Sequence, residues 1–177
     1  MARDGGGSGR GGGSGRGEGR NDGRPQDPID QLERSHRRLR EVCDALTAGA
    51  RDRDLEAVAE ACAFFSRQVR RHEQDEELSL FPRLEVAEAR ETIERLRQEH
   101  RAHEALHERL ERAISGKPAR DDAGAWSEIE TLGADIARAY REHIELEEST
   151  LFPLARRTLA EPALGEILAE MAARRDR

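Results

Sequence analysis

The sequence predicts an all-α protein: an antiparallel, up-down four-helix bundle built from a duplicated helical hairpin, plus a short C-terminal helix. Three observations lead to this prediction. From Pro28 onward, apolar residues recur at alternating steps of three and four, which is the period of helices in a bundle. The pattern H-x3-E-E-x2-L-F-P occurs twice without a gap, at 72–82 and 143–153. No segment carries the strict apolar alternation that is typical of a half-buried strand.

The first hairpin is expected to occupy residues 28–82. Its first helix is predicted over 28–47, and a turn is predicted at 49–54, where glycine and aspartate interrupt the apolar pattern. Its second helix ends or kinks at Pro82, because proline has no amide proton for the helical hydrogen bond. The two apolar stripes are Ile29, Leu32, His36, Leu39, Cys43 and Leu46, and then Val58, Cys62, Phe65, Val69, His72 and Glu76.

The second hairpin repeats this spacing. Its first helix is predicted from about Glu88 to Ile114, where a Ser-Gly-Lys-Pro cluster follows. Its second helix ends or kinks at Pro153, and a short helix over 161–174 is expected to pack on the bundle. Equal spacing in both halves indicates an internal duplication. The matching stripes are Ile93, Leu96 and His100, and then Ile129, Gly133, Ile136, Tyr140, His143 and Glu147.

The first 27 residues differ in composition from the rest of the chain. Residues 1–27 are expected to form a disordered Gly/Arg-rich tail, since this stretch cannot bury apolar surface, and residues 28–177 are expected to form the helical domain. A binding arm for RNA is the alternative for the tail. Arms of that kind usually include aromatic residues, and this stretch has none.

Composition and charge narrow the function classes. The formal net charge of −7 argues against a general nucleic-acid binder. Cys43 and Cys62 are too few for a disulfide framework, and their seam positions favour small buried hydrophobes over a redox role. The sequence has no apolar run long enough to span a membrane and no signal-peptide core. A cytoplasmic, reducing location without a membrane partner is therefore expected.

Six ionisable side chains fall on the seam that faces the centre of the predicted bundle. In each H-x3-E pair the imidazole and the carboxylate are four residues apart, and therefore lie on one face of a helix. Four imidazoles and two carboxylates suit a borderline metal, and two carboxylates can bridge two ions held ~3.5–4 Å apart. The candidate metal ligands are His36, His72, Glu76, His100, His143 and Glu147.

A structural interpretation competes with the metal site. A single histidine on a helix seam is more often a satisfied core residue, and one H-x3-E pair is a common helix feature. Two copies in register, each with a matching seam histidine on the preceding helix, favour the metal, because buried imidazoles and carboxylates need partners. The sequence therefore predicts a bound metal in preference to a metal-free helical interaction module.

Over about residues 28–157, the chain resembles the hemerythrin-like HHE cation-binding domains, whose second and fourth helices carry the same repeated pattern. The resemblance implies a four-helix bundle around a non-haem centre of two iron ions. Ferritin-type bundles carry Glu-x-x-His motifs instead, which this chain lacks at the ligand positions. The roles implied are terminal iron ligands at His36, His72, His100 and His143, and bridging carboxylates at Glu76 and Glu147.

Three neighbours of this set have open roles. The oxygen carriers of the family have two histidines four apart on the third helix, whereas the residue four after His100 is Glu104. His103 is either a fifth ligand or proton donor, or a partly exposed seam residue. Glu73 is similar to an extra glutamate ligand of some iron-sensing members, or it is a surface charge. Tyr140 either hydrogen-bonds a ligand or packs in the core.

Glu77 and Glu148 follow the two candidate bridging carboxylates directly. We expect them to accept hydrogen bonds behind the ligands, or to be exposed, and not to bind metal. His107 is expected to have no role at the metal.

The family resemblance implies several activities. Open coordination positions are what a metal needs to bind a small ligand. The first expectation is a protein that binds or senses O2 or nitric oxide, or responds to iron or redox state. The alternative is a di-iron enzyme or repair factor, since some members repair iron–sulfur clusters under nitric oxide stress and others decompose peroxide. Repair members usually carry a cysteine-bearing N-terminal domain, where this chain has glycine-rich sequence.

Overall fold

Every regular element of the described residues is a helix. The computed structural model describes residues 27–84, 86 and 88–175, so the prediction for the tail lies outside the described residues except at Asp27. Over these ranges the prediction of an all-helical chain is confirmed. Within the same ranges, no helix is both long enough and apolar enough to cross a membrane.

The helices form four long rods and one short arm. The first rod is α1 (Pro28–Asp52), and the third is α4 (Arg90–Ser115). The second is α2 (Leu55–Phe64), a π-helical segment (Phe65–Val69), α3 (Arg70–Asp75), a second π-helical segment (Glu76–Leu80) and a 3₁₀ turn (Phe81–Leu84). The fourth is α5 (Ala123–Leu146), a π-helical segment (Glu147–Leu151) and α6 (Phe152–Thr158). The arm is α7 (Glu161–Arg175).

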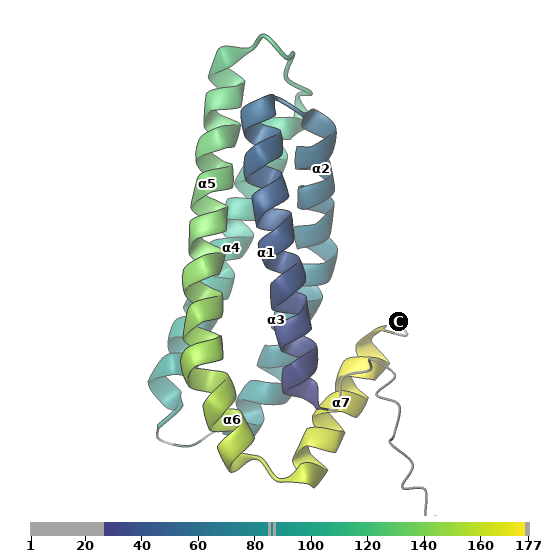
Figure 1. Cartoon of the computed structure of the whole chain (residues 1–177), viewed down its shortest axis with the longest axis vertical. Coiled ribbons are helices and arrows are strands. Elements are labelled where there is room, and N and C mark those ends of the chain that lie inside the picture. Colours follow the sequence, from purple (N-terminus) through teal and green to yellow (C-terminus); the bar gives the residue numbers. More distant parts are fainter. Residues whose placement is uncertain (1–26, 85, 87, 176–177) are drawn as a thin grey trace, which may run out of the picture.

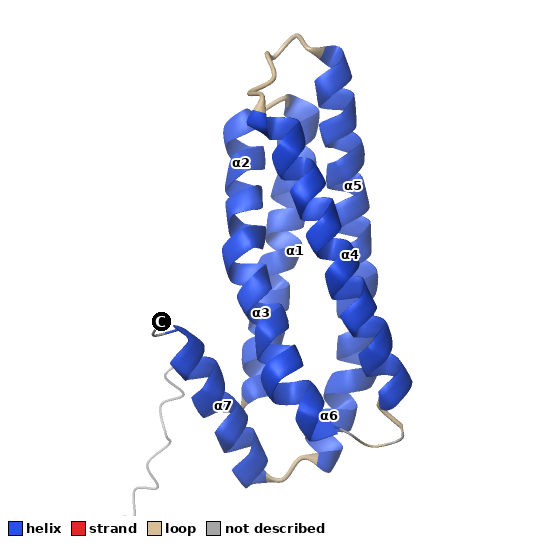
Figure 2. Ribbon diagram, turned by 180° about the vertical axis from the view of Figure 1, so that it is seen from behind, coloured by secondary structure: helices blue, strands red, loops and turns tan. Residues whose placement is uncertain are grey.

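The four rods lie side by side along the long axis of the molecule (Figure 1). α1 packs against α2 and α5, and α4 packs against the same two helices, so the rods enclose a common interior. Seen from behind, α4 slants along the near face of the bundle, and α7 lies to the side of its lower end, next to α3 (Figure 2). α7 contacts α1 and α3 and buries Ile167 and Met171, so it packs on the bundle as the sequence predicted.

The first turn is shorter than predicted. α1 begins with Asp27 as its cap, whose side chain accepts from the Asp30 amide at 2.8 Å, and it continues to Asp52 instead of 47. Arg53, with φ of 54°, ends the helix in the left-handed region. Gly49 is therefore inside the helix, where a Cβ would lie 2.8 Å from Ala57 Cβ. The absence of a side chain at Gly49 permits close packing of α1 on α2. The sequence pattern had instead suggested that Gly49 begins a turn.

The two prolines of the repeated pattern have different surroundings. Pro82 lies in the 3₁₀ turn that ends the second rod, as a residue without an amide proton can. Pro153 lies directly after the π-helical segment, at the start of α6, and the fourth rod does not end there but continues to Thr158. Ahead of each proline is a π-helical segment that begins at Glu76 or at Glu147.

Two apolar clusters fill the interior on either side of a polar layer. One cluster includes Leu39 on α1 and Val69 on the second rod, and the other includes Leu32 and Leu80 on the same two rods. The candidate ligands lie between these positions along each rod. Apolar packing above and below therefore holds the polar layer in a fixed position and keeps bulk water from it.

Both cysteines are buried in the first cluster, and we expect them to be unreactive in the folded protein. Burial raises the pKa of Cys43 and of Cys62 to about 12. At pH 8 only about one thiol in 10,000 would then be ionised, and the thiolate is the reacting form. Labelling with iodoacetamide, followed by mass spectrometry, should be slow at pH 8 and should accelerate roughly tenfold per pH unit. Fast native labelling, equal to that in denaturant, would contradict this.

Candidate metal centre

The six candidate ligands lie together at the centre of the bundle. Each of two overlapping groups offers one ligand atom per residue, with all atoms of a group within 4.8 Å of one another. Each of the six side chains is at most 5% exposed. The first group is His36, His72, Glu76 and Glu147, and the second is Glu76, His100, His143 and Glu147.

The two shared carboxylates each present one oxygen to each group. Oε1 of Glu76 is 3.2 Å from Nε2 of His72, and Oε2 is 3.4 Å from Nε2 of His100. Glu147 is arranged in the same way: its Oε2 is 3.0 Å from Nε2 of His36, and its Oε1 is 3.4 Å from Nε2 of His143. Two carboxylates with this orientation can bridge a pair of cations.

The donor atoms fit cations better than they fit one another. Both oxygens of Glu76 and of Glu147 are buried without a hydrogen-bond partner, and so are Nε2 of His100 and Nε2 of His143. Nε2 of His36 and Nε2 of His72 face each other at 3.1 Å. Two nitrogens bound to one ion at about 2.1 Å would lie ~3.0–3.4 Å apart. Unsatisfied buried atoms at ligand spacing are therefore the structural signature of a metal site.

Three of the four histidines have a carboxylate behind the ring. Nδ1 of His36 is 3.0 Å from Oε1 of Glu148, and Nδ1 of His100 is 2.7 Å from Oε1 of Glu77. This bond places the proton on Nδ1 and leaves the Nε2 lone pair directed inward, which is the arrangement found behind many metal-bound histidines. Glu77 and Glu148 therefore lie where the sequence analysis expected acceptors of hydrogen bonds behind the candidate ligands.

The third carboxylate was not anticipated. Nδ1 of His143 is 2.8 Å from Oε2 of Glu99. Glu99 directly precedes His100, and its contact with His143 on another rod is not visible from the spacing within either helix. The duplication concealed it, because the corresponding residue of the first hairpin is Ser35.

The Leu-Phe-Pro end of each pattern also contributes to the site. Phe152 stacks on His36 with ring centroids 5.3 Å apart and planes 11° apart. Phe81 stacks on His100 with centroids 6.1 Å apart at the same angle. Each phenylalanine thus supports an imidazole on a different rod. The motif positions the ligands of the other hairpin as well as its own.

The two central carboxylates have pKa shifts of opposite direction. Burial raises the pKa of Glu76 well above its usual range, and the neighbouring Glu147 carboxylate raises it further. Burial would also raise the pKa of Glu147, but His143 and His36 outweigh it and hold that pKa well below its usual range. Burial lowers the pKa of His143, yet Glu147 and Glu99 outweigh burial and raise it to about 10. Cations bound here would neutralise the negative charge of the two carboxylates in place of protons.

The three residues with open roles surround the second group without joining either group. His103 is 2% exposed, and its ring centroid is 4.9 Å from that of His143. Its Nδ1 is 3.7 Å from Oε1 of Glu73, and burial raises the pKa of Glu73 to about 7. The Tyr140 hydroxyl is 3.0 Å from Nε2 of His107, a residue for which the sequence suggested no role.

Comparison with known proteins identifies relatives of this chain. The sequence model of the hemerythrin HHE cation-binding domain matches residues 27–155. A Haemophilus influenzae protein, described only as an uncharacterized protein, is 30% identical over 164 residues, which are 84% of this chain and 90% of the relative. The resemblance noted in the sequence is therefore confirmed.

Proposed function

This chain belongs to the hemerythrin HHE cation-binding domain family, and we propose that it holds a non-haem di-iron centre within an antiparallel four-helix bundle built from a duplicated hairpin. One observation carries the proposal: two groups of buried donors share both carboxylates, and each carboxylate directs one oxygen to each group. Four imidazoles with two carboxylates suit iron better than they suit magnesium or calcium, which prefer oxygen ligands.

In this proposal His36 and His72 are the terminal ligands of one ion, and His100 and His143 those of the other. Glu76 and Glu147 bridge the pair. A pair of iron ions with open positions supplies reversible binding of O2 or nitric oxide, or a response to redox state. The protein excludes water by burial, and it fixes each terminal imidazole except that of His72 with an outer carboxylate.

The iron count tests the proposal directly. Protein reconstituted anaerobically with ferrous iron, and then desalted, should retain two irons per chain. Oxidation should produce ligand-to-metal absorption in the near ultraviolet, and the reduced protein should change its spectrum reversibly with O2 or nitric oxide. Retention of one iron, or of a single zinc in competition, would contradict the di-iron centre and indicate a mononuclear site.

A di-iron enzyme that decomposes peroxide is the second candidate, and one observation favours it. A cavity of about 390 Å³ opens beside His100, and Glu73 and Glu77 line it. A small polar substrate would therefore have a polar path towards the second group of ligands. Turnover of hydrogen peroxide faster than that of the same amount of free iron would select this candidate, and equal rates would reject it.

A further inference from the structure

The four candidate histidines differ in what lies behind the ring. Three have a protein carboxylate within 3.0 Å of Nδ1. His72 is the exception: it is 5% exposed, and its Nδ1 has no hydrogen-bond partner. A buried imidazole N–H without an acceptor costs free energy, so this atom needs a partner that the described residues do not supply.

The duplicated hairpins explain why the partner is missing. His36 corresponds to His100, so the residue before each, Ser35 and Glu99, correspond as well. Glu99 accepts from His143, which corresponds to His72. Ser35 has no carboxylate, and its hydroxyl donates instead to the Gln31 carbonyl of its own helix at 3.3 Å.

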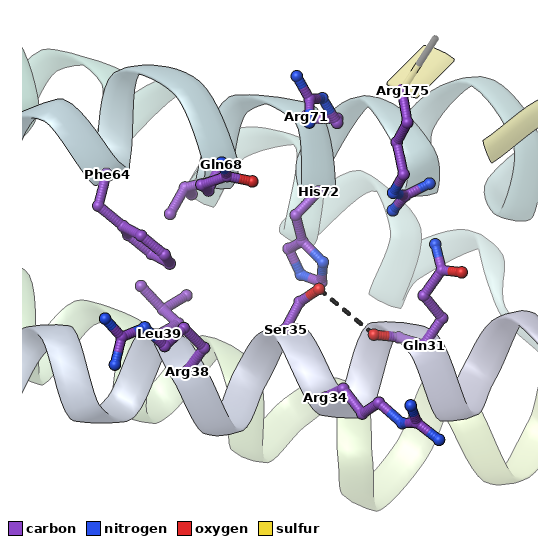
Figure 3. Close-up of a pocket in the computed structure, with 11 residues that line it drawn as sticks. Gln31, Arg34, Ser35, Arg38, Leu39, Phe64, Gln68, Arg71, His72 and Arg175 are labelled. Atoms are coloured by element: carbon purple, nitrogen blue, oxygen red, sulfur yellow. Dashed lines mark hydrogen bonds between the residues drawn. The ribbon is translucent and has the colours of Figure 1, made fainter. Parts of the chain in front are cut away.

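A cavity of about 590 Å³ lies where that carboxylate would be (Figure 3). The imidazole of His72 points from α3 towards Ser35 on α1, between the two walls of this cavity. Leu39, Phe64 and Val69 form an apolar part of the lining. Among the described residues, no aspartate or glutamate lines the cavity. The cationic side chains that line it are Arg34, Arg38, Arg71 and Arg175.

The arginines differ in their partners. Arg38 pairs with Glu41 at 2.8 Å, and Arg175 pairs with Asp75 at 2.8 Å. Arg71 makes no ion pair with any described residue. The cavity therefore combines a guanidinium that has no ion-pair partner among the described residues, a buried imidazole N–H and an apolar wall. This combination suits an anion with a hydrocarbon part.

We propose that this cavity binds a small organic carboxylate, which accepts the Nδ1–H of His72 and pairs with Arg71. The bound carboxylate lies behind His72 as Glu99 lies behind the corresponding His143. This inference rests on the proposed function in one respect, because a metal on Nε2 is what keeps the proton of His72 on Nδ1. The hydrocarbon part of the ligand lies against Phe64 and Leu39.

Binding in the cavity should strengthen metal binding by the first group. Outer partners of metal-bound histidines change metal affinity by roughly 10–100-fold. Thermodynamic linkage requires the effect to be reciprocal, so iron should tighten carboxylate binding by the same factor. The ligand would then act as a regulator of iron occupancy at His36 and His72.

Calorimetric titration with hexanoate tests the proposal on both the iron-loaded and the metal-free chain. Hexanoate should bind at one site, and acetate should bind more weakly because it lacks the hydrocarbon part. Arg71→Gln should weaken hexanoate binding at least tenfold. Ser35→Glu should abolish it, since the new carboxylate would take the ligand's place behind His72. Arg70→Gln, the adjacent exposed arginine outside this cavity, should leave the affinity unchanged.

The possible results separate this inference from the di-iron proposal. Two irons per chain without hexanoate binding would overturn the carboxylate site and leave the di-iron centre standing. Hexanoate binding that depends on Ser35 and Arg71 in a chain that retains no iron would support the site and reject the di-iron centre. Inorganic phosphate binding as tightly as hexanoate, or equal effects of Arg70→Gln and Arg71→Gln, would overturn the assignment to an organic carboxylate.

Discussion

Glu76→Gln and Glu147→Gln are each expected to reduce the iron content to at most one per chain. Each substitution removes one bridging carboxylate, and an amide is a poor ligand with the same shape. Burial raises the pKa of Glu76 and favours its neutral form, so Glu76→Gln should leave the stability of the metal-free chain close to that of the parent. Glu147→Gln removes the buried anion that pairs with His143 and His36, so it should lower the stability of the metal-free chain. The measurement is iron per chain after desalting, combined with thermal unfolding of the metal-free proteins.

Two variants serve as controls for this prediction. Glu145→Gln changes an exposed carboxylate on the same rod as Glu147, and it should retain two irons. His107→Ala should also leave the iron content unchanged, because His107 contacts Tyr140 and belongs to neither ligand group. Full iron content in both Glu76→Gln and Glu147→Gln would show that the bridging assignment is wrong.

Iron binding is expected to raise the stability of the fold substantially. The metal-free centre buries unsatisfied oxygens and nitrogens, and cations that bind only the folded chain shift the unfolding equilibrium. At free iron about 1,000-fold above the dissociation constant, the stabilisation is ~4 kcal/mol for each bound ion. For a chain of this size each ion then corresponds to a rise in Tm of roughly 8–16 °C. Anaerobic thermal unfolding with and without ferrous iron measures the shift.

The double variant Glu76→Gln/Glu147→Gln separates specific from general effects of iron. It should show no iron-dependent rise in Tm, because neither bridge remains. A rise as large as that of the parent chain would mean that the stabilising ions bind elsewhere.

Much of the centre was accessible from the spacing of a few residues. The four-residue step in His72–Glu76 and His143–Glu147 places both pairs on one helix face, and the structure brings all six candidate ligands together. The helical state of the described chain followed from the same apolar period. The shared helix face and the helical state were predictable because they depend on local geometry that a 3.6-residue helix imposes, whereas metal binding by these six residues stays a prediction.

Features that depend on contacts between rods were not accessible in this way. Gly49 indicated a turn, but it lies inside α1, where the absence of a side chain allows close contact with Ala57 on α2. Glu99 and His107 each have a partner on another rod, His143 and Tyr140, and no spacing within one helix reveals such pairs. The cavity beside His72 likewise depends on how α1, α3 and α7 pack.

The wide helical turns at Glu76–Leu80 and Glu147–Leu151 bear on the history of the chain. A π-helical segment accommodates one extra residue in an α-helix, and such segments are rare. Both begin at the same position of the repeated pattern, at the candidate bridging carboxylate. A single insertion in an ancestral hairpin, followed by gene duplication and fusion, accounts for both at once. The π-helical segment at Phe65–Val69 has no counterpart in the continuous α5, although the residue spacing there is the same in both halves, so it reflects local backbone geometry and no added residue.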